Sequence, residues 1–151
     1  MRAVVQRVTE ASVTSAAAPS EAAEVTGSIG RGVVALVGAT HDDSTDAARR
    51  LADKLWRLRL FEDADGVANL SCEQLGAEVL VVSQFTLYAD TRKGRRPSFV
   101  AAARPEVAEP LVTAVVERLR ELGATVATGR FGTYMQVRLV NDGPWTVTLE
   151  V

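Results

Sequence analysis

The chain has 151 residues, of which 47% are hydrophobic and 24% are charged, as is ordinary for one globular domain with its own core. A net charge of −2 excludes a protein that coats nucleic acid by bulk electrostatics, so any phosphate contact requires a local basic patch. A single cysteine excludes an internal disulfide and a cysteine-rich metal site.

Alternating residues predict a strand at the start of the chain. In "RAVVQRV", Ala3, Val5 and Arg7 share one face. Arg7 and Glu10 also interrupt the apolar stretch that a signal peptide would need, and no apolar run reaches the roughly 18 residues of a membrane span. We therefore expect a cytoplasmic protein without membrane contact, folded as one domain over residues 1–151.

Small residues separate the next two strand-like segments. The insert "AAAPSEAA", residues 16–23, lies between "SVTS" and "EVTG", and we expect a long hairpin loop there. Two continuous apolar runs follow at residues 32–38 and 78–83. Runs of this kind are typical of strands that are covered on both faces.

Two helices are predicted from apolar residues at helical spacing. The first covers residues 43–61, with Ser44 or Thr45 suited to cap its N-terminus. The second covers residues 109–123, with Pro110 in its first turn and a glycine at its end.

The C-terminal segment has the strongest strand signal in the chain. "YMQVRLV" and "WTVTLEV" both alternate apolar and polar residues, and "NDGPWT" joins them. The proline is unexpected, since Asn-Asp-Gly alone would serve a hairpin turn. Helices segregated from antiparallel hairpins predict an α+β domain, with two main helices and a curled, barrel-like, mostly antiparallel sheet.

The motifs that commonly reveal a catalytic site are missing. There is no GxSxG elbow, no HExxH and no glycine loop that would cradle a phosphate. The one histidine, His41, lies in the loop-like "THDDS" and is interpreted as a surface residue. We therefore expect no metal and no cofactor. An enzyme with this sequence would work with backbone groups, hydroxyls and the substrate itself.

Polar residues follow the apolar run that ends at residue 83. Ser83, Gln84 and Thr86 are interpreted either as a capped strand end with a satisfied amide or as the lining of a pocket. A basic loop follows in "TRKGRRPSF", and it is either a phosphate-facing patch or a solvated loop. Four cations crowd around one glycine in this loop: Arg92, Lys93, Arg95 and Arg96.

Several segments in the same order resemble the D-aminoacyl-tRNA deacylase family. These are "QRVTEASV", "EVTGSIGRGVVALVG", "SQFTL", "GRRPSF", "MQV" and, near the C-terminus, "LVNDGP" with a threonine two positions after the proline. Each segment is weak by itself, but together they cover nearly the whole chain apart from residues 16–23.

The resemblance implies an enzyme that hydrolyses the ester between a D-amino acid and the 3′-terminal adenosine of tRNA. It implies a homodimer in which a Gly-Pro pair, joined by a cis peptide bond, reaches into the pocket of the partner subunit. Gly143 and Pro144 match that pair and would reject L-aminoacyl groups. The residues that match the catalytic strand end are Ser83, Gln84, Phe85 and Thr86. The basic loop would bind tRNA.

A rigid backbone wall at the α-carbon would reject every L side chain and leave a D side chain free, so glycyl-tRNA would also be cleaved. Backbone N–H groups of Phe85 and Thr86 are candidates for the oxyanion hole. Thr86 as a nucleophile would lack a base, so we expect the ribose 2′-hydroxyl of the substrate to help activate water.

Three further residues are expected to support the site: Arg7, Phe99 and Met135. Arg7 is either a strand-edge arginine that reaches solvent or a buried guanidinium that anchors the Gly-Pro segment. The family usually has valine after the proline, where this chain has Trp145. Because Trp145 alternates with Val147, we interpret it as a core or subunit-interface residue.

Two other functions stay open at this stage. One is a non-catalytic RNA-binding module, although an aromatic content of 5% argues against base stacking on a sheet. The other is a hydrolase of small amides that depends on Thr86 or on the thiol of Cys72.

Overall fold

Six strands form one mixed sheet in the computed structural model, which describes residues 1–151. They are β1 (Arg2–Ala16), β2 (Glu24–Ile29), β3 (Gly32–Gly38), β6 (Glu78–Ser83), β7 (Val126–Thr128) and β8 (Tyr134–Glu150). Their order is β2-β1-β3-β6-β7, with β8 also paired to β1. β1 runs antiparallel to β2, β3 and β8, whereas β3, β6 and β7 are parallel. The predicted curled, mostly antiparallel sheet is confirmed.

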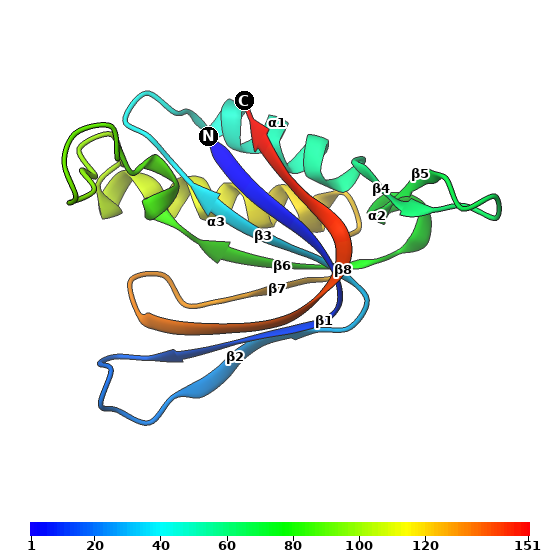
Figure 1. The fold of residues 1–151 in the computed structure, drawn as a ribbon, viewed down its shortest axis with the longest axis horizontal. Coiled ribbons are helices and arrows are strands. Elements are labelled where there is room, and N and C mark those ends of the chain that lie inside the picture. Colours follow the sequence, from blue (N-terminus) through cyan, green and yellow to red (C-terminus); the bar gives the residue numbers. More distant parts are fainter.

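Helices cover one face of this sheet. The two main helices are α1 (Thr45–Trp56) and α3 (Pro105–Glu121), and the short ones are α2 (Cys72–Leu75) and η1 (Phe85–Tyr88). A small hairpin of β4 (Arg59–Glu62) and β5 (Ala68–Ser71) extends from the end of α1. Figure 1 shows α1 and α3 side by side along the part of the sheet that contains β3, β6 and the first half of β1.

The sheet bends into two leaves that diverge from one end of the molecule (Figure 1). β1 pairs with β3 through its first half and with β2 through its second half. β8 pairs with β1 along both halves, and its register shifts between Gln6 and Glu10. The "NDGPWT" segment is therefore not a turn. It is the point where one continuous strand passes from one leaf to the other.

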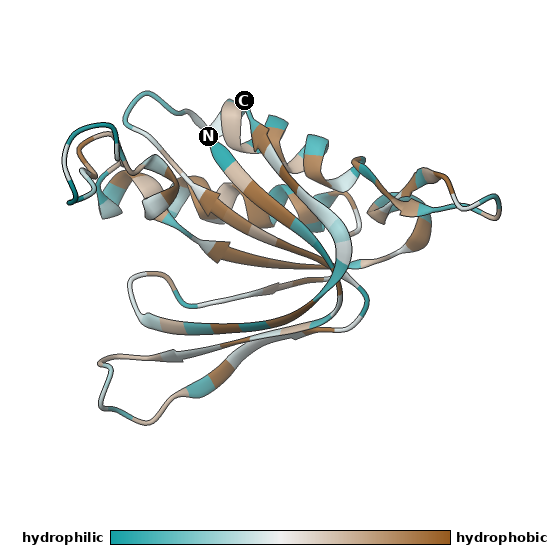
Figure 2. Cartoon of the chain, viewed as in Figure 1, coloured by the Kyte–Doolittle hydropathy of each residue, from teal (hydrophilic) through white to brown (hydrophobic).

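Apolar residues fill both sides of the central strands. The larger core lies between the sheet and the helices and includes Val33 and Val79. The smaller core lies on the opposite face and includes Val34 and Leu80. Figure 2 shows this as hydrophobic colour along β3 and β6. The prediction that both strands are covered on both faces is confirmed.

The predicted boundaries of the first helix need one correction. Ser44 caps α1 as expected, since its side chain accepts a hydrogen bond from Ala47 N at 3.3 Å. However, α1 ends at Trp56, and residues 59–62 form β4. Leu60 and Phe61 are buried in this strand. Because apolar residues also fit the buried side of a helix, the sequence could not show where α1 ends.

The second helix begins earlier than predicted. Pro105, not Pro110, occupies the first turn of α3, and Pro110 lies inside the helix. Proline suits the first helical position, where its missing N–H has no intrahelical acceptor. The predicted end is confirmed, because Gly123 follows the last residues with a φ of 92°.

The two ends of the chain lie together. The ammonium group of Met1 donates to Asp43 Oδ1 at 2.6 Å and to the carbonyl of Val151 at 2.9 Å. None of the helices combines the length and the apolar character that crossing a membrane demands.

Candidate active site

A cavity of about 710 Å³ lies where β3 and β6 end. Its walls come from these strand ends, the start of η1, the segment before and within α3, and the start of β8. The lining residues are Val37, Gly38, Ala39, Val82, Ser83, Gln84, Phe85, Phe99, Ala102, Ala103, Pro105, Ala108, Val112, Phe131, Gly132, Thr133, Tyr134, Met135 and Val137. We call this cavity the pocket.

Close backbone contact shapes the wall of the pocket. Gln84 N donates to Val37 O at 2.7 Å, which folds the chain after β6 over the end of β3. A Cβ atom added to Gly38 would lie 2.8 Å from Gln84 O. Glycine at this position therefore lets the two backbones approach, and any side chain would push them apart.

The structure brings most of the predicted site residues together. Ser83, Gln84 and Phe85 line the pocket, as do the two supporting residues Phe99 and Met135. The Phe85 and Phe99 rings contact each other edge to face, with centroids 5.2 Å apart.

Thr86 is placed just outside the lining. It lies in η1, and its hydroxyl accepts a hydrogen bond from Gln84 Nε2 at 2.5 Å. This bond orients the Gln84 amide within the pocket wall. The N–H groups of Phe85 and Thr86 open η1, where a helix leaves its first N–H groups without intrahelical acceptors.

The chemistry available to the pocket is sparse. Its lining contains no carboxylate, imidazole, ammonium or guanidinium group, and Tyr134 is its only titratable residue. No three His, Cys, Asp or Glu side chains lie close enough to hold a metal ion. The pocket therefore offers backbone groups, the hydroxyls of Ser83, Thr133 and Tyr134, and the Gln84 amide.

Other lining residues were not predicted. α3 contributes Ala108 and Val112, and the segment before β8 contributes Phe131 and Thr133. These are ordinary apolar or small residues with no local signal. Gly38 did have a signal, because it ends an apolar strand at the same edge of the sheet as Ser83.

The Gly143–Pro144 segment lies elsewhere, at the bend of β8. The peptide bond between the two residues is cis, the isomer that the resemblance implies. Both residues are exposed, and neither lines the pocket of its own chain.

Arg7 holds this segment from the neighbouring strand. It is only 5% exposed, so the interpretation as a buried guanidinium is the one confirmed. Nε lies 2.8 Å from Asp142 Oδ2 and donates to Asp142 O at 3.1 Å. Nη1 donates to the carbonyl of Leu60 at 2.7 Å. The residue before Gly143 is thus fixed by charge-assisted hydrogen bonds.

Asn141 and Trp145 complete the anchor. Asn141 Nδ2 donates to Arg7 O at 2.8 Å and to Trp145 O at 3.2 Å, which ties both sides of the bend. The Trp145 ring lies 5.6 Å from the Arg7 guanidinium and packs against the larger core. The larger side chain in place of valine therefore lies over the guanidinium, within this chain.

The basic loop is partly neutralised. Arg92 binds both carboxylate oxygens of Asp90, at 2.9 and 2.8 Å, and this guanidinium lowers the pKa of Asp90 to about 2. An isolated bridge between Asp90 and Ser98 closes the loop. The remaining cations are exposed and form no ion pair: Lys93, Arg95 and Arg96.

Two other candidates can now be placed. Cys72 is buried, and burial raises the pKa of its thiol to about 12, so a thiolate nucleophile there is not supported. His41 is exposed, as predicted, and its Nε2 lies 2.8 Å from Val100 O.

Known proteins resemble this chain over nearly its whole length. The chain matches the family described as D-Tyr-tRNA(Tyr) deacylase over residues 4–150. A D-aminoacyl-tRNA deacylase of Nocardia farcinica is 59% identical over 153 residues, covering 99% of both chains. One of Chloroflexus aurantiacus is 55% identical over 150 residues, covering 99% of this chain and 90% of the relative.

Solved structures share the fold. The c-Myc DNA unwinding element binding protein superposes with a TM-score of 0.89 at 39% identity, over 100% of this chain and 99% of the other. A probable eukaryotic D-amino acid tRNA deacylase superposes with a TM-score of 0.82 over 99% and 98% of the two chains. At 18% identity, the second similarity concerns the fold alone.

Proposed function

The chain belongs to the D-Tyr-tRNA(Tyr) deacylase family, and we propose that it hydrolyses the ester of D-aminoacyl-tRNA to free D-amino acid and tRNA. It is a carboxylic ester hydrolase. One observation supports this function most directly: the polar groups that line the pocket are backbone, hydroxyl and amide groups, without a carboxylate, imidazole, ammonium or guanidinium group. An aminoacyl ester is activated enough for such a site, and it brings its own hydroxyl group.

The size and composition of the pocket suit the end of a charged tRNA. A volume of about 710 Å³ falls within the range of roughly 300–1,000 Å³ that is typical of small-ligand sites. Apolar walls from Phe85, Phe99 and Val112 would enclose the adenosine and the amino-acid side chain. Ser83 and Gln84 supply the few polar groups that orient a ligand.

The working site requires two subunits. Gly143 and Pro144 are exposed and lie apart from the pocket of their own chain. The pocket mouth has an exposed apolar rim that includes Phe85 at 56% and Tyr134 at 59% exposure, as expected for a surface that another protein covers. In a homodimer with twofold symmetry, each Gly-Pro segment would enter the partner's pocket, and both pockets would be completed alike.

Chirality would be read by exclusion. Backbone atoms of the Gly143–Pro144 segment, held by Arg7, would lie against the α-carbon on the side where an L side chain projects. A D side chain points away from this wall, and glycine has no side chain to exclude. Glycyl-tRNA is therefore a substrate in this proposal.

Hydrolysis would be assisted by the substrate. The N–H groups of Phe85 and Thr86 would stabilise the oxyanion of the tetrahedral intermediate. The ribose 2′-hydroxyl next to the ester would activate the attacking water, since the lining offers no general base. No metal or other cofactor has a role in this mechanism.

The basic loop would contact the tRNA near its 3′ acceptor end. Lys93, Arg95 and Arg96 have no ion-pair partner, whereas Arg92 is engaged by Asp90. We place the enzyme in the cytoplasm, where charged tRNA is found.

The decisive experiment compares matched tRNAs with the purified protein. We expect hydrolysis of D-tyrosyl-, D-alanyl- and glycyl-tRNA and resistance of L-tyrosyl- and L-alanyl-tRNA, with and without a chelator. The Gly143→Ala variant should damage the wall, because a Cβ there would intrude on the substrate or shift the Pro144 ring. A non-catalytic RNA-binding module would bind all five tRNAs and cleave none of them.

A further inference from the structure

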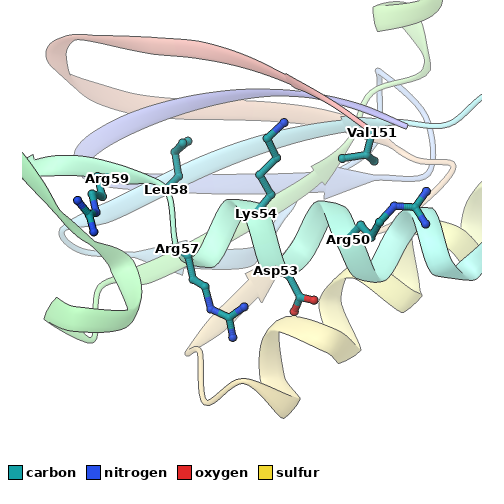
Figure 3. A pocket seen from close by; sticks show the side chains of 7 residues that line it. All are labelled: Arg50, Asp53, Lys54, Arg57, Leu58, Arg59 and Val151. Carbon is teal, nitrogen blue, oxygen red and sulfur yellow. The ribbon is translucent and has the colours of Figure 1, made fainter.

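A second hollow lies along α1 (Figure 3). It has a volume of about 610 Å³ and is open to solvent on one side. We call it the basic hollow. Its lining residues are Arg50, Asp53, Lys54, Arg57, Leu58, Arg59 and Val151. It shares no residue with the pocket.

Cations dominate the basic hollow. Four of its seven lining residues are cationic and one is a carboxylate, in a chain whose net charge is −2. Arg50, Lys54 and Arg57 follow the spacing that places residues along one side of a helix, and Arg59 extends the row onto β4. The carboxylate of Asp53 is engaged from α3, with Arg118 Nε 2.9 Å from Oδ1.

The cations have few partners of their own. Arg50 and Arg59 form no ion pair, and Arg57 meets only Glu73 at 3.5 Å, where both side chains are about half exposed. Lys54 donates to the backbone carbonyl of Glu150 at 3.4 Å. By contrast, the adjacent Arg49 is paired with Glu121 at 2.8 Å. Clustered cations repel each other, and an anionic ligand would relieve this repulsion.

The shape of the basic hollow favours an extended anion over a small one. Its cations are exposed, three of them follow one side of α1 and its C-terminal cap, and no buried polar group defines a closed site. A row of this kind fits successive phosphates of a nucleic-acid backbone, and guanidinium groups bind phosphate oxygens in pairs.

The position along α1 also fits a long ligand. The chain enters α1 soon after Gly38 and Ala39, which line the pocket. A helix of 12 residues spans about 18 Å, so the basic hollow lies up to one helix length from the pocket end of α1.

We propose that the basic hollow binds the phosphate backbone of the tRNA acceptor stem while the aminoacylated 3′ end occupies the pocket. This inference rests on the proposed function. Double-stranded RNA is recognised largely through phosphates and 2′-hydroxyls, so these contacts would serve many tRNAs alike.

Binding of uncharged tRNA across a range of salt concentrations tests the proposal. The variant Arg50→Ala with Arg59→Ala removes the two cations without ion pairs. Arg31→Ala with Arg138→Ala is the matched control, since it also removes two exposed cations without ion pairs, but from outside the basic hollow. We expect the first variant to bind about tenfold more weakly, with a salt slope smaller by about two. The control should bind like the parent.

Activity provides a second readout. The Arg50/Arg59 variant should show a raised KM and an unchanged kcat with D-tyrosyl-tRNA. It should hydrolyse the 3′ ester of D-tyrosine with adenosine at the parent rate, because this compound lacks the stem. Parent-like tRNA binding, or an equal loss in the control, would overturn the proposal. If the parent binds tRNA through this hollow but cleaves no D-aminoacyl ester, the proposed function fails and the binding site stands.

Discussion

The pocket wall and the Gly143–Pro144 segment are both held firmly, but by different forces. At the wall, Gly38 lets the backbone of Gln84 approach the end of β3, and apolar side chains fill the space around it. At the segment, a guanidinium that is 5% exposed fixes the chain through hydrogen bonds. One part of the proposed site therefore depends on shape, and the other depends on a single buried charge.

Removal of that charge should have the largest effect. Arg7→Ala would leave the carbonyl of Leu60 and the carboxylate of Asp142 without their donor. We expect the free energy of unfolding in urea to fall by about 3 kcal/mol, with loss of selectivity against L-alanyl-tRNA. Arg31→Ala is the control, because Arg31 contacts the same Phe61 ring from an exposed position. If the Arg7→Ala protein were as stable as this control, the Arg7 charge would not be what fixes the Gly143–Pro144 segment.

The pocket should depend on the substrate for acid–base chemistry. With 2′-deoxyadenosine at the 3′ end of tRNA, we expect deacylation to slow by about 100-fold, the lower end of the usual contribution of general acid–base catalysis. Single-turnover rates should reveal the loss, and binding of the deoxy substrate should be unchanged. Equal rates on both substrates would mean that a group of the protein activates the water.

A methyl group at Gly38 should disturb the pocket wall through shape alone. The new Cβ would meet Gln84 O at 2.8 Å and Leu87 Cβ at 3.3 Å. We expect about 1–3 kcal/mol of destabilisation from overpacking and a lower kcat with D-tyrosyl-tRNA. Gly30→Ala is a suitable control, because its nearest neighbour would be a Glu78 carboxylate oxygen at 3.6 Å. A fully active Gly38→Ala protein would show that the wall can shift without cost.

The variant Trp145→Val tests how much the Trp145 ring stabilises the segment that Arg7 holds. Valine is the residue that the family resemblance implies here, and it removes the ring that lies over Arg7. We expect the free energy of unfolding to fall by about 1–2 kcal/mol, from lost packing and a lost cation–π contact. Thr148→Val on the opposite face, where Thr148 is exposed, should change it by less than about 0.5 kcal/mol. A more stable Trp145→Val protein would show that tryptophan is tolerated rather than used.

Thr86→Ala should have the smallest effect. The Thr86 hydroxyl accepts one hydrogen bond from Gln84, and such a bond contributes about 1 kcal/mol. We therefore expect only a few-fold decrease in kcat, measured with D-tyrosyl-tRNA, and a similar decrease for Gln84→Ala. An acyl-enzyme on Thr86, detected by mass spectrometry, would instead assign Thr86 a covalent role.

Local sequence patterns predicted which helices and strands form better than they predicted where each one begins or ends. Ser44 was recognisable as a cap because capping depends on the next three residues. The end of α1 was not recognisable, because Leu60 and Phe61 are apolar in either a helix or a strand. Pro105 and Pro110 both suit a helix start, and only the packing of α3 against the sheet decides between them.

The candidate site depends even more than the helix ends on contacts between residues that are distant in sequence. Strand-end polarity and family resemblance predicted Ser83, Gln84 and Phe85 in a pocket. The two interpretations of Arg7 could not be separated from sequence, since its partners Leu60 and Asp142 lie 53 and 135 residues away. Ala108 and Phe131 line the pocket only because the fold brings them there.

The pairing of the first strand with the last also has a consequence for folding. β1 meets β8 along both leaves, from Arg2 opposite Glu150 to Ala16 opposite Tyr134. Contacts between residues so far apart in sequence are slow to form, and one edge of β1 stays open until β8 has been synthesised. An open strand edge is a template for pairing with other chains. The bend that presents Gly143 and Pro144 is therefore among the last features to form on the ribosome, after the pocket strands β3 and β6 have already emerged.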